Sequence, residues 1–195
     1  MTRPARLLDA AFFSRDTREV ARDLIGVTLR HGETSGVIVE TEAYRGDAAS
    51  HFVTRPRTGR IMGTTCGALY VYRIYGMHRC MNVTTETDHP GAVLIRALDP
   101  TTGLDIIRAR RPGRPDRELC SGPARLFVAL GLSDELNGRP FDESLTWSLP
   151  ARRPEIATGP RIGIRHATEL PWRFMAVDNP HVSHGGSRRL RAVAP

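Results

Sequence analysis

Two segments, residues 36–44 and 69–82, alternate in the manner of β-strands, yet both place polar and aromatic side chains where a core strand carries aliphatic ones. All four tyrosines of the chain lie in these segments, although only 6% of the residues are aromatic. Alternate residues of an extended strand share a face, so Glu40, Glu42 and Tyr44 are predicted to point the same way. The pattern therefore predicts a sheet that carries a functional site.

The remaining sequence predicts a series of short elements. Helical spacing of apolar side chains predicts helices over residues 9–25, 102–111 and 124–130. Apolar runs predict strands over residues 27–30, 36–44, 69–75, 79–85 and 92–98, near Ile162, and over 173–177. The predicted fold class is α+β: a single compact domain with a curved, mainly antiparallel β-sheet and peripheral helices.

No internal repeat or shift in composition divides the chain, so we expect one domain over residues 1–195, with a disordered basic tail at 186–195. Residues 45–67 contain glycine, proline and four arginines but few apolar side chains, which predicts a long loop. Arginines on such a loop indicate contact with phosphate groups.

The charge of the chain favours a polyanionic partner, because the formal net charge is +7 and all 28 basic residues are arginines. A composition bias that replaced lysine throughout explains the same count, and both explanations can hold together. The absence of lysine has a chemical consequence in either case. No lysine side chain can attack a sugar carbon or form a Schiff base.

The sequence excludes several classes of protein. No apolar run reaches 18 residues and the first residues do not resemble a secretion signal, so we expect a cytoplasmic protein, nucleoid-associated if bacterial, with no membrane contact. Three widely spaced cysteines fit neither a disulfide framework nor a metal knuckle. His181 and His184 lack neighbouring carboxylates or thiols, so no metal and no cofactor is expected.

Several aromatic rings beside one carboxylate can form a slot that stacks on a planar ring while offering a base or nucleophile. On a strongly basic protein the obvious planar ligand is a nucleobase. An ordinary aromatic core with a solvated glutamate at its edge explains the spacing equally well. Either Glu40 or Glu42 could be the base, since both are predicted on one face.

Six ordered blocks resemble the alkyladenine, or 3-methyladenine, DNA glycosylase family. They are Val39–Tyr44, Ala49–His51, Leu69–Asn82, Val93–Leu98, Glu118–Pro123 and Arg161–Gly163. The resemblance implies a monofunctional enzyme without a cofactor, which flips an alkylated or deaminated purine out of double-stranded DNA and hydrolyses its N-glycosidic bond. The implied substrates are 3-methyladenine, 7-methylguanine, hypoxanthine and ethenoadenine, and a monomer is expected. Two rivals remain: a non-catalytic module that binds damaged DNA, and a nucleoside hydrolase.

The resemblance also implies roles in hydrolysis. Glu42 matches the general base that deprotonates the attacking water, and Arg96 and the backbone carbonyl of Ile162 match the positions that hold this water. Glu40 remains the alternative base. Water has to be the nucleophile, since the chain has no lysine for a lyase reaction.

Five further positions match the family's base pocket. Tyr44 on one side and His51 with Tyr72 on the other match the walls that sandwich the flipped base. Tyr75 resembles the wedge that enters the DNA helix, and Asn82 matches the position that crowds the amino group of normal guanine. Of the remaining tyrosines and cysteines, Tyr70, Cys66 and Cys80 are predicted to be packing residues.

The chain departs from the family pattern at several places. The segment from Gly59 through Met62 to Gly63 lacks the asparagine and the aromatic residue usual there, so a role for Met62 beside the wedge is not assigned. Arg165 and Asn179 replace small residues. Such changes can alter the range of lesions or the contacts with the DNA strands without changing the hydrolytic centre.

Overall fold

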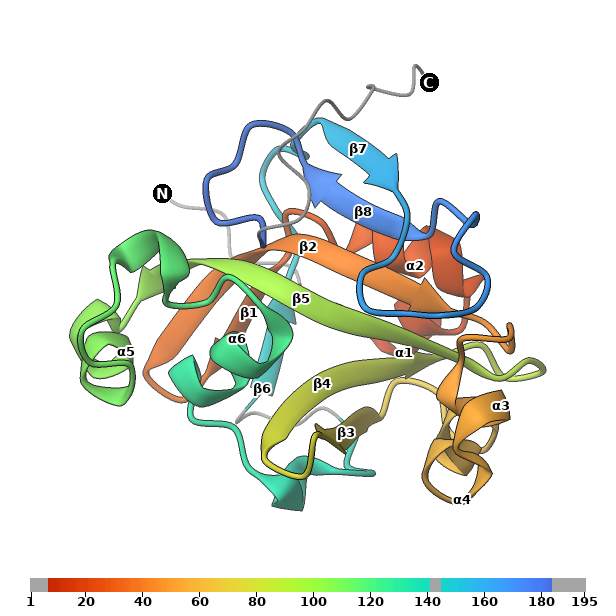
Figure 1. Ribbon diagram of the computed structural model, residues 1–195. Coiled ribbons are helices and arrows are strands. Elements are labelled where there is room, and N and C mark those ends of the chain that lie inside the picture. The colour runs from red at the N-terminus through yellow and green to blue at the C-terminus, as the bar shows by residue number, and fades with distance from the viewer. Residues whose placement is uncertain (1–6, 141–144, 184–195) are drawn as a thin grey trace.

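Two long strands, β2 (Thr34–Tyr44) and β5 (Gly91–Thr102), pair antiparallel and form the middle of the sheet. The computed structural model of the protein describes residues 7–140 and 145–183. In these residues the main path of an antiparallel, 8-stranded sheet runs β3-β4-β5-β2-β1-β6, while β8 pairs with β2 and β7 (Figure 1). The other strands are β1 (Thr28–His31), β3 (Leu69–Ile74), β4 (His78–Thr85), β6 (Leu145–Ser148), β7 (Ile156–Gly159) and β8 (Arg173–Ala176).

Strand β2 changes its neighbour halfway along. Its first half pairs with β1, whereas residues from Glu40 to Glu42 pair with β8. The register with β5 shifts on both sides of Glu40, which marks a β-bulge. A bulge bends and twists its strand, so the second half of β2 turns toward β8. Both glutamates are thereby placed between β5 and β8.

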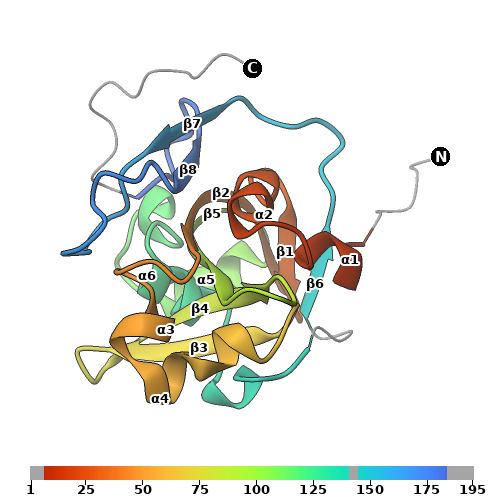
Figure 2. The same cartoon turned by 90° about the vertical axis from the view of Figure 1, so that its right-hand side faces the viewer.

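Short helices surround the sheet. They are α1 (Ala10–Phe13), α2 (Thr17–Asp23), α3 (His51–Thr54), α4 (Pro56–Gly59), α5 (Leu104–Arg110) and α6 (Pro123–Ala129), with 3-10 turns η1 (Arg60–Gly63), η2 (Asp116–Glu118) and η3 (Asp134–Leu136). Helix α2 packs on β2 and β5, and α6 packs on β4 and β5. Figure 2 shows α2 and α6 on different sides of these central strands, so apolar side chains fill the space on both sides. The predicted α+β class with a mainly antiparallel sheet is confirmed.

The single helix predicted over residues 9–25 is wrong, because the segment folds as α1 and α2. The Asp9 carboxylate accepts a hydrogen bond from the Phe12 N–H at the start of α1. The Asp16 carboxylate accepts one from the Arg18 N–H at the start of α2. Each aspartate satisfies a free backbone donor, so a second cap starts a new helix.

The long loop predicted over residues 45–67 is also wrong, since it contains α3, α4 and η1. Ser50 caps α3 through its hydroxyl, and Pro56 lies in the first turn of α4. Gly59 is required by packing, because a Cβ there would lie 2.2 Å from the His51 carbonyl oxygen. At Gly63 a Cβ would lie 2.8 Å from the Phe52 ring, so the small residue makes room for this aromatic side chain.

The strand predicted near Ile162 is wrong as well. Residues 160–172 connect β7 to β8 without regular structure, and β7 ends before them, at Gly159. The left-handed backbone of Gly163 (φ +76°) and Ala167 (φ +51°) is incompatible with an extended strand. Strand β6 was not predicted, whereas β8 confirms the strand expected over 173–177. The predicted tail at 186–195 lies outside the described residues.

Candidate active site

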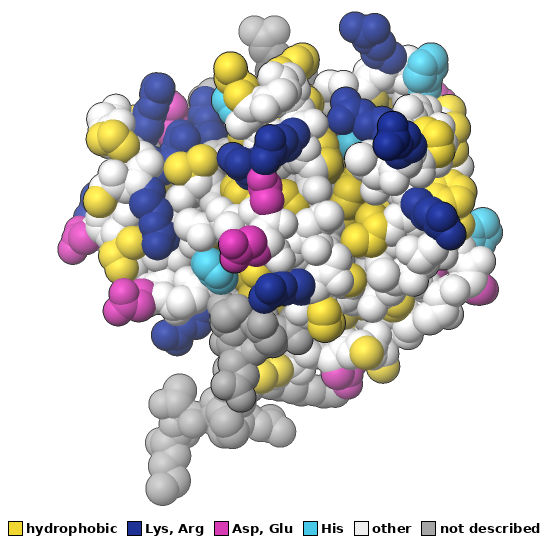
Figure 3. Space-filling model, turned by 90° about the horizontal axis from the view of Figure 1, so that it is seen from below, with side chains coloured by type: hydrophobic (Ala, Val, Ile, Leu, Met, Phe, Trp, Pro, Cys, Tyr) yellow, Lys and Arg dark blue, Asp and Glu magenta, His cyan; other side chains and the backbone are white. Residues whose placement is uncertain are grey.

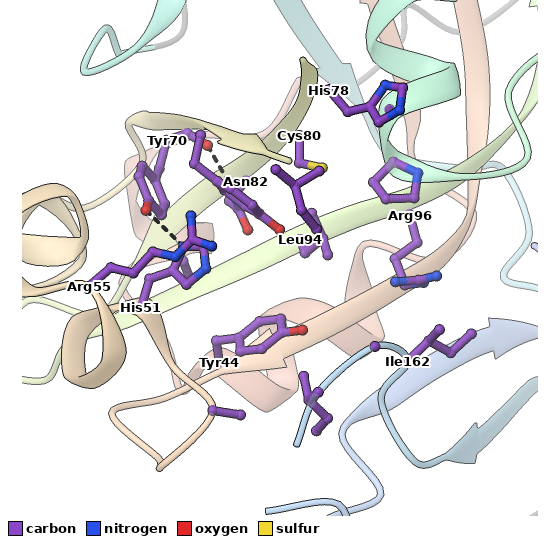
Figure 4. A pocket seen from close by; sticks show the side chains of 18 of the residues that line it. Tyr44, His51, Arg55, Tyr70, His78, Cys80, Asn82, Leu94, Arg96 and Ile162 are labelled. Atoms are coloured by element: carbon purple, nitrogen blue, oxygen red, sulfur yellow. Dashed lines mark hydrogen bonds between the residues drawn. The ribbon is translucent and has the colours of Figure 1, made fainter. Parts of the chain in front are cut away.

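A pocket of about 680 Å³ opens between the β3–β4 hairpin, the ends of β2 and β5, α3 and the connection from β7 to β8 (Figure 4). Most of the predicted site residues line it: Tyr44, His51, Tyr72, Tyr75, Asn82, Arg96 and Ile162. Glu42 does not line it and is fully buried. The fold thus brings residues from six separate segments to one cavity, with the predicted base behind its wall.

Glu42 contacts three groups that themselves line the pocket. Its Oε1 accepts a hydrogen bond from the Ile162 N–H at 2.7 Å and lies 3.3 Å from Nη1 of Arg96. Its Oε2 accepts a hydrogen bond from the Tyr44 hydroxyl at 2.8 Å. Burial, and then the charge of Glu42, raise the pKa of Tyr44 well above its usual value, so this hydroxyl stays protonated and donates. The carboxylate is held in place directly behind the pocket.

Glu40, the alternative base, has a different environment. Its Oε1 accepts hydrogen bonds from Nε of Arg96 at 3.1 Å and Nε of Arg173 at 2.6 Å. Its Oε2 accepts one from the Ser183 N–H at 2.7 Å. Of these three partners only Arg96 lines the cavity, whereas all three partners of Glu42 line it. The geometry therefore favours Glu42 over Glu40 as the carboxylate that serves the pocket.

Aromatic side chains form two facing walls of the pocket. Figure 4 shows Tyr44 across the pocket from His51, Tyr70 and Asn82. The rings of His51 and Tyr72 meet edge to face, with centroids 4.3 Å apart. Burial, with a smaller contribution from the charge of Arg55, lowers the pKa of His51 to about 4. His51 is consequently a neutral wall at pH 7.

Two residues that the sequence did not assign to the site support these walls. Tyr70 is buried, as predicted for a packing residue, but it lines the pocket and its hydroxyl lies 2.9 Å from Nδ1 of His51. Arg161 lies behind Tyr44, with Cζ 4.7 Å from the ring centroid, and forms an ion pair of 2.7 Å with Asp47. The signal that could have found Arg161 was its position beside Ile162, in one of the six blocks that resemble the family.

Tyr75 protrudes from the molecule at the turn between β3 and β4, where its side chain is 87% exposed. Its backbone is left-handed (φ +51°), like that of the following Gly76 (φ +72°). A left-handed conformation costs an L-residue other than glycine about 1–2 kcal/mol. An exposed aromatic ring at a strained position fits a residue retained for an interaction rather than for stability.

The rim of the pocket is positively charged. Arg55, Arg125 and Arg165 line the pocket, as does the buried Arg96, and no aspartate or glutamate among the described residues does so. Figure 3 shows arginine side chains spread over the lower face of the molecule, with a few acidic side chains between them. Of the other departures from the family pattern, Met62 is buried in the pocket wall, whereas Asn179 donates a hydrogen bond to Asp99 away from the pocket.

The described residues contain no cluster of three or more histidine, cysteine or acidic side chains placed to hold a metal ion. In the same part of the chain, no helix has the length and apolar character needed to span a membrane.

A buried carboxylate paired with arginine, behind a slot with aromatic walls and a basic rim, is typical of enzymes that act on a flipped-out base of a nucleic acid. Comparison with known proteins identifies the family. The model of the methylpurine-DNA glycosylase family matches residues 11–180, and the chain belongs to this family. It is accordingly a DNA glycosylase, a hydrolase that acts on N-glycosyl bonds.

Relatives in several organisms are similar over almost their whole length, and each carries the provisional name 3-methyladenine DNA glycosylase. A protein of Methanoculleus marisnigri is 46% identical over 188 residues, covering 90% of this chain and 98% of the relative. One of Nitrosospira multiformis is 46% identical over 176 residues, covering 88% and 91%. One of Rhizobium meliloti is 45% identical over 179 residues, covering 90% and 95%.

Proposed function

We propose that the protein acts in base-excision repair as a monomeric, monofunctional glycosylase on double-stranded DNA. Its substrates are alkylated or deaminated purines of the 3-methyladenine, 7-methylguanine, hypoxanthine and ethenoadenine class, and its product is an abasic site. The observation that carries this proposal is the placement of Glu42, whose carboxylate contacts Tyr44, Arg96 and Ile162 at the wall of an aromatic pocket.

Glu42 serves as the general base in this proposal. An ionised carboxylate offers about four lone-pair positions, and Oε2 uses one of them for the Tyr44 hydroxyl. A water molecule can bind at the remaining position of Oε2, where Arg96 and the carbonyl of Ile162 also hold it. Nη1 of Arg96 lies 3.3 Å from Oε1 of Glu42, so the guanidinium is close enough to orient both the carboxylate and the water.

In the reaction the water oxygen forms a bond to C1′ of the deoxyribose while the bond between C1′ and the purine nitrogen breaks. The bonding electrons leave with the purine, and Glu42 receives the proton of the water. Alkylation at N3 or N7 makes the purine cationic, which weakens this bond before the enzyme acts. Modest general-base catalysis, about 10²–10⁴-fold, is then sufficient for such lesions.

The walls of the pocket explain how a damaged base is held. Tyr44 stacks on one face of the base, and Tyr72 and His51 contact the other. Electron-rich rings attract a cationic purine, and a neutral His51 does not repel it. Asn82 donates a hydrogen bond to the Tyr70 carbonyl at 3.0 Å, which restrains its amide. Its role in this proposal is to crowd the amino group of normal guanine.

Tyr75 acts as the wedge. A flipped nucleotide leaves a gap in the base stack, and extrusion costs a few kcal/mol, least for a damaged base that pairs and stacks poorly. The exposed ring of Tyr75 lies at the mouth of the pocket and can fill that gap.

In the test the protein is incubated with duplexes that each carry one hypoxanthine, ethenoadenine or methylated purine, and the DNA is then treated with alkali. Strand breaks that appear only after alkali are expected, because no lysine is available for strand cleavage. Breaks without alkali would contradict a monofunctional reaction. Binding without release of the base would identify a binding module, and release from free nucleosides alone would identify a nucleoside hydrolase.

A further inference from the structure

Two carboxylates and two guanidinium groups lie together beside the pocket: Glu40, Glu42, Arg96 and Arg173 are all buried. Charges removed from water are costly unless they are paired and hydrogen-bonded. Glu42 is the base in the proposed reaction, and Arg96 is its partner. Glu40 and Arg173 have no assigned role in that chemistry.

Glu40 fixes the orientation of Arg96 through its oxygens and through Ser183. Nε of Arg96 donates to Oε1 of Glu40 at 3.1 Å, and Nη2 donates to the Ser183 hydroxyl at 3.3 Å. Ser183 in turn donates its backbone N–H to Oε2 of Glu40 at 2.7 Å. Glu40 and Ser183 therefore hold one edge of the guanidinium plane, and Nη1 is left to face Glu42 at 3.3 Å.

The contacts span the chain. Glu40 is on β2, Arg96 on β5 and Arg173 on β8, while Ser183 follows β8 at the end of the described residues. A planar guanidinium with three engaged nitrogens has little freedom to rotate, so its position relative to Glu42 depends on all of these elements.

We propose that Glu40 is a positioning residue, which acts through Arg96 to hold the charge and the hydrogen-bond donors of Arg96 against Glu42 and the attacking water. This inference rests on the proposed function of Glu42. Glu40 accepts from Arg96, Arg173 and the Ser183 N–H, and an amide in its place has no charge and only one acceptor oxygen for these three donors. Arg96 is then held less firmly, and Nη1 is no longer fixed at the catalytic carboxylate.

The test is a double-mutant cycle with Glu40→Gln and Arg96→Gln, measured as the single-turnover rate of excision from an ethenoadenine duplex at saturating protein. Glu40→Gln is expected to slow excision about 10- to 100-fold, as a small misplacement of a catalytic group does. Affinity for the lesion duplex is expected to stay within about two-fold, since the walls and rim are unchanged. In the Arg96→Gln background the same change is expected to have little further effect.

Three outcomes would overturn the inference: a wild-type excision rate for Glu40→Gln, a parallel loss of duplex affinity, or effects that multiply in the double variant. A purely structural role would give multiplying effects, because it would not act through Arg96. Glu42→Gln is measured alongside. If that variant is active, the proposed base is wrong; if it is inactive while Glu40→Gln keeps the wild-type rate, only the positioning role fails.

Glu40→Gln also leaves Arg173 without its carboxylate partner and can prevent folding. Ser183→Ala is the second variant, because it removes only the hydroxyl that accepts from Arg96 and keeps the backbone N–H to Glu40. It is expected to slow excision less than Glu40→Gln, with unchanged affinity and no further loss in the Arg96→Gln background. An unchanged excision rate in a folded Ser183→Ala protein would count against the orientation of Arg96 by this network.

Discussion

Replacing Tyr75 by asparagine should make the protein more stable and less active at the same time. Tyr75 holds a left-handed backbone (φ +51°) with a side chain that is 87% exposed, so it strains the turn and contributes little burial. Asparagine adopts the left-handed region more readily than other side chains with a Cβ. The wedge role, in contrast, requires the aromatic ring.

The magnitude follows from two opposing contributions. Relief of the left-handed strain contributes at most about 1–2 kcal/mol. Loss of the small buried part of the ring, about 30 Å² of a side chain that can bury about 200 Å², costs about 0.7 kcal/mol. The expected net gain is about 0.5–1 kcal/mol, which raises Tm by about 1–4 °C in a chain of this length.

Thermal unfolding and single-turnover excision measure the two effects. Tyr75→Asn should raise Tm and slow excision from a lesion duplex, while excision from the same lesion in single-stranded DNA is unchanged because no stack has to be opened. Tyr75→Phe is the matched control and should keep both the Tm and the duplex rate. A lower Tm for Tyr75→Asn would refute the strain argument, and an unchanged duplex rate would refute the wedge.

Two further predictions concern the walls of the pocket. The pKa of His51 is lowered to about 4 from an unfolded value near 6.5, so stability should fall as pH falls from about 6.5 to 4, by up to about 3 kcal/mol and nearer 2 after screening of a partly exposed ring. His51→Gln should remove this part of the pH dependence in urea unfolding; an unchanged pH profile would contradict it. Asp47→Asn should cost about 3 kcal/mol, because it leaves Arg161 buried without its carboxylate, whereas Asp134→Asn, which breaks exposed ion pairs with Arg73 and Arg79, should cost much less. Equal losses of stability in the two variants would show that burial does not decide how much these ion pairs contribute to stability.

The alternation of residues 36–44 predicted strand β2 and the shared face of Glu42 and Tyr44, and the hydrogen bond between them confirms that face. The alternation could not distinguish Glu40 from Glu42 as the base, because it predicts both side chains on that face. That distinction depends on Arg173 and Ser183, which are more than 130 residues away in sequence. Such long-range partners leave no local periodicity.

Short elements were the weakest part of the prediction. Helices α3 and α4 have four residues each, too few for a hydrophobic period, so the segment from 45 to 67 resembled a loop. Caps at Ser50 and Asp16 were visible in the sequence, but a cap residue is equally common in a turn. The connection around Ile162 lines the pocket and therefore contains apolar residues. In the sequence these residues resemble a short strand.

The central claim, that Glu42 is the general base, is tested most directly by Glu42→Gln. The matched control is Glu33→Gln, the same chemical change at an exposed turn between β1 and β2. With an ethenoadenine duplex at saturating protein, Glu42→Gln should lower the single-turnover excision rate at least about 100-fold while still binding the duplex, and Glu33→Gln should match the wild type. Excision by Glu42→Gln at the wild-type rate would contradict the account.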